Sequence, residues 1–197
     1  MFNTSPCAAG CGRSAISGTN ICYVHQADKE QTKAAILAQI AENEIIKDLS
    51  VSGMHFSGVD FSNRRFYGCN FRDTYFSQCV FSGSLMRMCF FDFAEFTDCE
   101  FIKSDLQFLS FAGTQIIGCT FSGSELVHIN FLGATIARTV FSNLNLYNSR
   151  FINAEMDNVL FNDCNVKRVN FISARQKDIV FKSSNTAEAI FKLDEDE

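Results

Sequence analysis

The sequence predicts an all-β solenoid, in which short strands wind into a four-sided coil. Phe accounts for 22 of the 197 residues, beside no Trp and a single Pro, and 18 of these Phe share one phase of a five-residue repeat between Phe56 and Phe191. A small residue such as Cys, Ser, Thr or Ala often stands two positions before the large one. A period of five fits neither an α-helix nor a plain strand, so the repeat indicates another regular structure.

The spacing of large and small residues explains how the repeat folds. Residues two apart in an extended chain point the same way, so both the large and the small residue face inward. The other three positions hold polar residues, Gly and Asn, which suit corners. Each five-residue unit therefore forms one side and one corner, and four units close a coil.

The repeat resembles that of the pentapeptide-repeat family, whose consensus is small, Asp or Asn, Leu or Phe, polar, Gly. The local matches include Ser104-Asp105-Leu106, Cys69-Asn70-Phe71 and Val169-Asn170-Phe171, and the register runs unbroken over residues 54–193. The resemblance implies a right-handed quadrilateral β-helix of about seven coils with 20 residues each, occupying residues 51–193. Phe residues 20 apart would then stack in the core.

Both ends of the solenoid need protection from solvent. Residues 28–50 are predicted to form a capping helix, which Asp28 and Gln31 begin as a capping box. Gln176 and Thr186 place polar groups at inward positions of the last coil, which is therefore expected to be loose or covered by a second subunit. Residues 194–197, all acidic, are expected to be a solubilising tail.

Residues 1–27 contain a candidate metal site, formed by Cys7, Cys11, Cys22 and His25. Two close pairs of soft ligands suit a structural Zn²⁺ ion, because four protein ligands leave no open position for catalysis. The segment is similar to small Cys/His zinc modules, and the alternative is a set of incidental thiols in a flexible tail. The other six cysteines fall at small inward positions and are expected to fill the core: Cys69, Cys79, Cys89, Cys99, Cys119 and Cys164.

One outer face of the predicted coil is apolar. Ala112, Leu132, Ile152 and Ile172 line up outside it, flanked by Phe90 and Phe93, while Met88 and Phe108 stand on the neighbouring face. The opposite face carries mainly Ser. Exposed apolar patches mark interfaces, so we expect contact with a protein partner or self-association as a dimer there. The alternative is that β-branched residues simply favour strands.

The motifs favour a non-enzymatic protein-binding scaffold. The sequence contains none of the glycine-rich phosphate loops, nucleophile elbows or HExxH motifs of common enzymes. The resemblance offers an alternative, since some quinolone-resistance members of the family mimic DNA, bind type II topoisomerase (gyrase) and protect it from inhibitors. The net charge of −5 argues against this, because the last four residues supply −4 and the repeats are neutral.

Charge and hydropathy bear on the remaining partners. Arg13 is the only basic residue of the Cys/His segment, so direct nucleic-acid binding is disfavoured. No apolar run reaches the ~18 residues of a membrane span, and the start of the sequence lacks the features of a secretory signal. Nine cysteines, an odd number, favour reduced thiols and a cytoplasmic location. His55 and His128 are expected to be solvated surface histidines with no carboxylate or cysteine partner.

Overall fold

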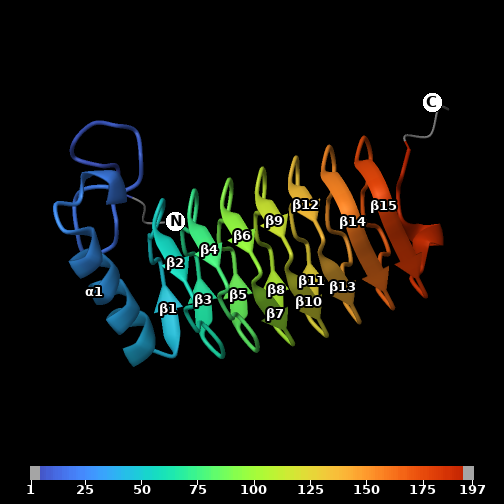
Figure 1. Ribbon diagram of the computed structural model, residues 1–197, viewed down its shortest axis with the longest axis horizontal. Helices are drawn as coiled ribbons and strands as arrows, with labels where there is room; N and C mark the ends of the chain where they lie inside the picture. The colour runs from blue at the N-terminus through green and yellow to red at the C-terminus, as the bar shows by residue number, and fades with distance from the viewer. Residues whose placement is uncertain (1–4, 193–197) are drawn as a thin grey trace.

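The computed structural model describes residues 5–192, and the prediction of a β-solenoid is confirmed. The chain forms a rod of about seven turns with one α-helix at its N-terminal end (Figure 1). Neighbouring coils pair in parallel at a spacing of 20 residues, so that Phe56 lies beside Phe76 and Phe121 beside Phe141. The large residue of every pentad therefore meets the same kind of residue one coil further on.

The coil has four sides, numbered here in chain order. Side 1 is a five-stranded sheet: β1 (Ile45–Lys47), β3 (Arg65–Tyr67), β5 (Leu85–Arg87), β8 (Asp105–Gln107) and β11 (Glu125–Val127). Side 2 is held by single bridges that join Ser50, Asn70, Phe90, Ser110, Asn130, Arg150, Asn170 and Ile190 in turn. It comprises residues 50–52 and the matching triplets up to 190–192.

Sides 3 and 4 belong to one ten-stranded sheet. Side 3 contains β2 (His55–Ser57), β4 (Tyr75–Ser77), β6 (Glu95–Thr97), β9 (Gln115–Ile117) and β12 (Thr135–Ala137). Side 4 contains β7 (Glu100–Ile102), β10 (Thr120–Ser122) and β13 (Val140–Ser142). The long strands β14 (Glu155–Asn162) and β15 (Arg175–Lys182) cross from side 3 to side 4.

The core consists of stacked Phe rings. The ladder of side 4 runs from Phe61 to Phe181, and the ladder of side 2 from Phe71 to Phe191. Rings of successive coils lie nearly parallel, with centroids 4.6 Å apart between Phe101 and Phe121. The six cysteines predicted to fill the core are all buried. Dense, regular packing of this kind is what holds a narrow solenoid together.

The corners adopt left-handed backbone at every fifth position. Twenty residues other than Gly have φ between 48° and 59° there, and Asn and Asp are the commonest among them. The left-handed region brings Cβ close to a carbonyl oxygen, which is unfavourable for most residues. Gly avoids this contact because it has no Cβ, and the short polar side chains of Asn and Asp offset it by local hydrogen bonds. The corner sequence is therefore set by backbone geometry as well as by exposure.

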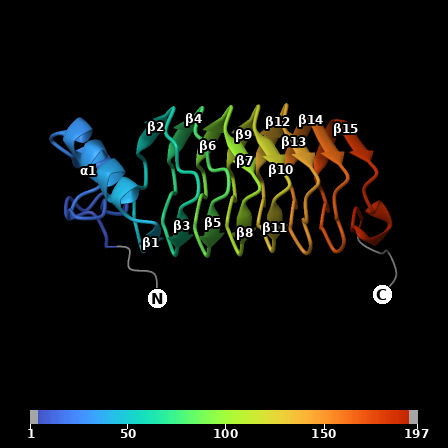
Figure 2. The same ribbon diagram turned by 90° about the horizontal axis from the view of Figure 1, so that it is seen from below.

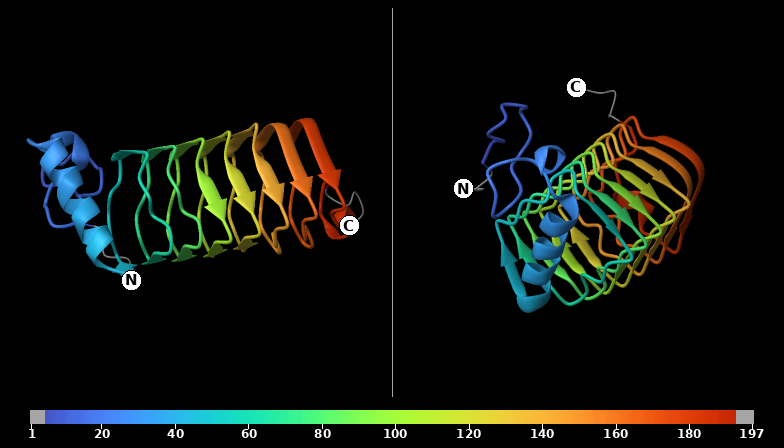
Figure 3. Two further views of the ribbon diagram at one scale, coloured as in Figure 1. Left: turned by 60° about the horizontal axis from the view of Figure 1, so that its bottom comes forward. Right: turned by 60° about the vertical axis from the view of Figure 1, so that its left-hand side comes forward.

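The α-helix α1 (Lys29–Glu42) lies across the N-terminal end of the solenoid (Figure 3). Asp28 accepts a hydrogen bond from the backbone N–H of Gln31, as predicted for the helix start. Ile36 and Ile40 are buried in the core cluster of the solenoid. The predicted helical range 28–50 is too long, because the helix ends at Glu42 and residues 45–47 already form the first strand of side 1.

The C-terminal coil is more open than the others. β15 is half-buried or exposed along its length, and the 3-10 helix η2 (Thr186–Glu188) closes the last turn (Figure 2). Gln176 is exposed at an inward position, and Phe191 at the end of its ladder is 37 % exposed. Within residues 5–192, no α-helix covers this end. None of the described helices has the length and apolar character to cross a membrane.

Candidate metal centre and interaction surface

The structure brings the four predicted metal ligands together. Cys22 precedes the 3-10 helix η1 (Tyr23–His25), which carries His25, while an antiparallel bridge between Pro6 and Ser14 folds the segment that carries Cys7 and Cys11. The four ligand atoms lie within 4.8 Å of one another. Nδ1 of His25 is 3.4 Å from the Sγ atoms of both Cys7 and Cys22.

These distances fit a tetrahedral metal ion. A zinc–sulfur bond of ~2.3 Å places tetrahedral sulfurs ~3.8 Å apart, and the Sγ atoms of Cys11 and Cys22 are 3.6 Å apart. The backbone N–H of Cys22 donates to Sγ of Cys7 and lowers the pKa of that thiol. A backbone N–H of Arg13 lowers the pKa of Cys11 in the same way, whereas burial raises the pKa of Cys22. The cluster can therefore hold a metal ion with soft ligands.

The Cys/His module is attached to the first coil. The backbone N–H of Ser17 donates to the carbonyl oxygen of Ser50 at 2.9 Å, and the Ser17 hydroxyl accepts from the N–H of Ser50 at 2.8 Å. Ile16 is buried in the same core cluster as the solenoid Phe residues. Arg64, a long side chain at an expected small position, donates to the carbonyl oxygen of Ala41 near the end of α1. The module and α1 thus form one cap.

The predicted apolar residues do lie along side 2. Ala112, Leu132, Ile152 and Ile172 occupy the same outward position in four successive coils, and Leu132 is exposed while the others are half-buried. Met88 and Phe108 were predicted for the neighbouring face. They stand instead at the corner between sides 1 and 2, so they border the same surface.

Three apolar residues occupy corner positions that Gly, Asn or Asp would adopt more easily. Met88, Phe93 and Phe108 have φ of 52°, 59° and 56°. Their side chains are 50 %, 67 % and 55 % exposed. A bulky residue in this region is unusual, and the conformation costs about 1–2 kcal/mol. Burial in the fold does not account for residues this exposed. We call Met88, Phe93 and Phe108 the corner residues.

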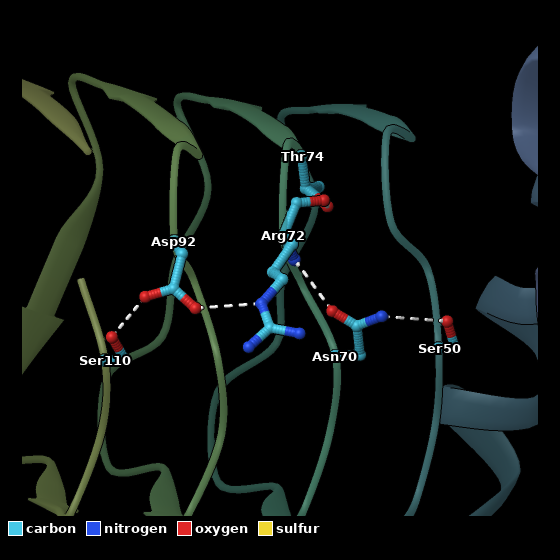
Figure 4. A network of polar contacts seen from close by, with 6 residues as sticks. All are labelled: Ser50, Asn70, Arg72, Thr74, Asp92 and Ser110. Atoms are coloured by element: carbon cyan, nitrogen blue, oxygen red, sulfur yellow. Dashed lines mark hydrogen bonds and ion pairs between the residues drawn. The ribbon is translucent and has the colours of Figure 1, made fainter. Parts of the chain in front are cut away.

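The early coils of side 2 are polar rather than apolar. Figure 4 shows Asp92 joined to Nε of Arg72 at 2.9 Å and to the hydroxyl of Ser110, while Asn70 donates to Ser50. The guanidinium of Arg72 also lies over the ring of Phe90, 4.6 Å from its centroid. The sequence prediction missed this pairing, although Arg72 and Asp92 are separated by one coil of 20 residues. The apolar part of side 2 therefore begins after Asp92.

His128 has no carboxylate or cysteine partner among the described residues, but it is half-buried and contacts an aromatic and an amide side chain. Its ring stacks on Phe108 at 4.9 Å with an angle of 7° between the planes, and its Nδ1 lies 2.8 Å from Nδ2 of Asn148. His55 similarly stacks on Tyr75 at 4.3 Å. Phe108 and His128 are 20 residues apart at the same corner, so the sequence could have predicted that they stack. His128 holds the Phe108 ring in place at the edge of side 2.

Sequence comparison assigns the repeats to a family. A model of pentapeptide repeats in eight copies matches residues 55–91 and 74–107, and a model of a pentapeptide repeat region matches residues 114–191. The fold and these matches define a repeat protein whose coils are built from five-residue units. The chain belongs to the pentapeptide repeat family. A search of curated proteins found no match.

A solved structure shows the same fold. A trypsin-treated variant of QnrB1, a plasmid-mediated fluoroquinolone resistance protein, matches with a TM-score of 0.63 at 18 % identity, over 72 % of this chain and 81 % of that one. HetL, involved in heterocyst differentiation regulation in the cyanobacterium Nostoc, matches at 10 % identity with a TM-score of 0.28, over 80 % of this chain and 95 % of its own. At 18 % identity the likeness to QnrB1 concerns the fold alone.

Proposed function

We propose that this protein is a non-enzymatic scaffold that binds a protein partner through side 2 and its corners. The observation that carries the proposal is the conformation of the corner residues. Each places a large apolar side chain in solvent on left-handed backbone. The exposed apolar surface and the strained backbone both cost free energy. Such costs are commonly retained where a residue serves binding rather than folding.

The arrangement of the corner residues supports a binding role. Phe108 is stacked on His128, and the Phe93 ring lies above Gly113, where an added Cβ would be only 2.6 Å from the ring atom Cδ1. Both rings are thus held in one position before any partner arrives. Rigid aromatic side chains lose little conformational freedom on binding, which favours affinity. Together with Ile152 and Ile172 they supply the exposed apolar centre of an interface.

For the Cys/His cluster we propose a structural Zn²⁺ ion bound by Cys7, Cys11, Cys22 and His25. A module of this size cannot bury a core of its own, so the metal would stabilise it. The hydrogen bonds between Ser17 and Ser50 would then pass that stability to the first coil. The role of the ion is to hold the cap.

DNA mimicry is the weaker alternative, because two of the acidic residues of side 3 are neutralised by cations one coil further on. Glu155 pairs with Arg175, and Asp157 pairs with Lys177 at 2.9 Å. A surface that replaces DNA needs continuous negative charge, since DNA carries one charge per ~1.7 Å of its axis. Binding to gyrase, and protection of gyrase from a quinolone in a supercoiling assay, would restore this alternative.

The binding proposal is tested by replacing all three corner residues with Asn, which tolerates their backbone. The immobilised variant should retain less than about a tenth of at least one protein that the wild type captures from its native cell extract. The matched control replaces exposed apolar residues of the other three sides, Ile45→Thr, Tyr75→Thr and Val180→Thr. Equal capture by both variants, or equal loss, would contradict the proposal.

Self-association through the same side needs a separate measurement. Ile152→Asp places a charge on side 2, and Ile102→Asp places one at the matching position of side 4. If a dimer forms through side 2, light scattering should show a halved mass only for Ile152→Asp. A partner other than this chain is indicated if the wild type is a monomer.

A further inference from the structure

Two adjoining depressions run along side 2 and its corner with side 1. Their volumes are about 330 and 470 Å³, and they share Asn148 and Arg150 as lining residues. We call them together the side 2 groove. It extends from Phe90 and Phe108 at one end to Ile190 at the other. Five coil steps of ~4.8 Å give it a length of roughly 24 Å.

The groove lining is positively charged. Arg150 and Arg168 are both exposed in it, and neither depression is lined by an Asp or Glu residue. Within residues 5–192, the structure places no carboxylate within ion-pair distance of either guanidinium. Glu188 follows Arg168 at the same corner, one coil further on, but its carboxylate pairs with Lys167. Arg87 likewise pairs with Asp105, whereas Arg150 and Arg168 keep their charge for a ligand.

The Asn side chains one coil before and one coil after Arg150 also favour an anion. The side-chain oxygen of Asn130 accepts from the N–H of Leu132 at 3.2 Å, and that of Asn170 accepts from the N–H of Ile172 at 2.9 Å. The oxygens are therefore used within the coil, and the amide NH₂ groups remain as donors. Among the described residues neither Nδ2 atom has an acceptor. The groove thus offers donors and positive charge beside apolar residues.

We propose that the side 2 groove binds an acidic segment of a partner protein, extended along the solenoid axis, with apolar side chains before and after its carboxylates on the same face of the segment. Arg150 and Arg168 would each bind a carboxylate through two parallel hydrogen bonds. Arg168 lies beside Asn170, the residue that bridges to Arg150, so the two guanidinium groups belong to adjacent coils. Carboxylates two residues apart along an extended chain are ~6.6 Å apart, which spans the ~4.8 Å step between adjacent coils.

Apolar contacts would fix the register of the segment. Phe108 and Ile190 stand at the two ends of the groove, and Ile152 lies beside Arg150 in the middle. Single-stranded nucleic acid also carries negative charge and stacks on aromatic rings. The overall charge of −5 disfavours it, because nucleic-acid binding depends on a strongly basic surface.

Fluorescence anisotropy tests the proposal with labelled peptides of about eight residues, the length that spans the groove. The Glu/Leu probe, Leu-Ser-Glu-Ser-Glu-Ser-Leu-Ser, places its Leu and Glu side chains on one face, and the matched Gln/Leu control has Gln in place of both Glu residues. The protein is the full chain with Asn and Gln in place of the acidic residues at 194–197, because that tail follows residues 190–192 of side 2 and would compete. The Glu/Leu peptide should bind at least tenfold more tightly than the Gln/Leu peptide.

Charge-matched variants locate the site. Arg150→Gln with Arg168→Gln should weaken binding of the Glu/Leu peptide about tenfold, whereas Arg138→Gln with Lys182→Gln removes the same charge from other corners and sides and should leave binding unchanged. Equal loss in both variants would overturn the proposal, since it would show attraction to overall charge. A labelled oligothymidine that binds more tightly than the acidic peptide would overturn it as well.

This inference rests on side 2 being the binding surface, but it can fail separately. If the triple Asn variant of the corner residues loses its native partner while the Glu/Leu peptide does not bind the wild type, the scaffold function stands and the acidic partner is wrong. If the triple variant captures every protein that the wild type captures, the scaffold function itself fails.

Discussion

Replacing Phe93 with Asn should leave the fold intact, and the expected energy follows from the structure. The residue has φ of 59° and is 67 % exposed, so about one third of its side chain is removed from water. Full burial of a Phe contributes roughly 1.5–3 kcal/mol, and one third of that is about 0.5–1 kcal/mol. Relief of left-handed strain returns about 1–2 kcal/mol, because Asn tolerates that region.

The strain term equals or exceeds the burial term, so the free energy of unfolding of Phe93→Asn should lie between the wild-type value and about 1.5 kcal/mol above it. Asn153 already occupies the same corner two coils beyond Gly113, with φ of 56°. Phe91→Ala provides the contrast, because Phe91 is fully buried between Phe71 and Phe111 and its truncation should cost about 3–5 kcal/mol.

Urea denaturation followed by circular dichroism measures both variants under the same conditions. A loss of more than about 2 kcal/mol in Phe93→Asn would refute the reasoning, because Phe93 would then be a structural residue. The proposal that the corner residues serve binding would lose its main support. A stable Phe93→Asn variant that no longer captures the partner would separate folding from function at one position.

Three further outcomes are expected. Phe131→Ala should lower the free energy of unfolding by about 3–5 kcal/mol in urea titrations, and a loss below about 1 kcal/mol would contradict the stacked core. Gly113→Ala should be less stable than Gly133→Ala in the same assay. Both glycines have φ of 64°, but only at Gly113 would the new Cβ meet the Phe93 ring. Equal stabilities of the two variants would mean that this ring moves freely. Removal of metal with a chelator should expose three thiols to Ellman's reagent at pH 8 and leave the β-sheet circular dichroism unchanged. The other six thiols should react only in denaturant, because they are buried. The thiol of Cys119 also raises the pKa of Cys99 to about 12, which keeps Cys99 protonated at pH 8. Reaction of all nine thiols on chelation would mean that the metal holds the whole rod together.

The Phe core could be predicted because the repeat dictates it. An unbroken period of five leaves one way to bury the side chains from Phe61 to Phe181, and residues 20 apart must then stack. The end of the helix could have been placed better from the same signal. Ile46 and Val51 share the phase of Phe56, so the solenoid begins before residue 50, and both are buried.

The interaction surface was predicted only in part. The repeat locates corners but does not say which backbone conformation they adopt, so the strain at Phe93 and Phe108 became visible only in the structure. Arg72 and Asp92 are 20 residues apart, so their pairing could have been predicted. Only the hydropathy of the outward residues of side 2 entered the prediction, and hydropathy does not reveal an ion pair. The convergence of Cys7, Cys11, Cys22 and His25 was predicted because the Cys and His spacing is typical of a metal site.

The winding of the coil has a consequence for changes in chain length. Each residue's side is fixed by its position within a turn of 20. Loss of a single pentad before Ile152 would rotate everything after it by a quarter turn, and Ile152 and Ile172 would face out from side 1. Loss of a whole turn would keep them on side 2 and merely bring them one layer, ~4.8 Å, closer to the cap. Only insertions and deletions in multiples of 20 can lengthen or shorten the rod while its docking face stays continuous.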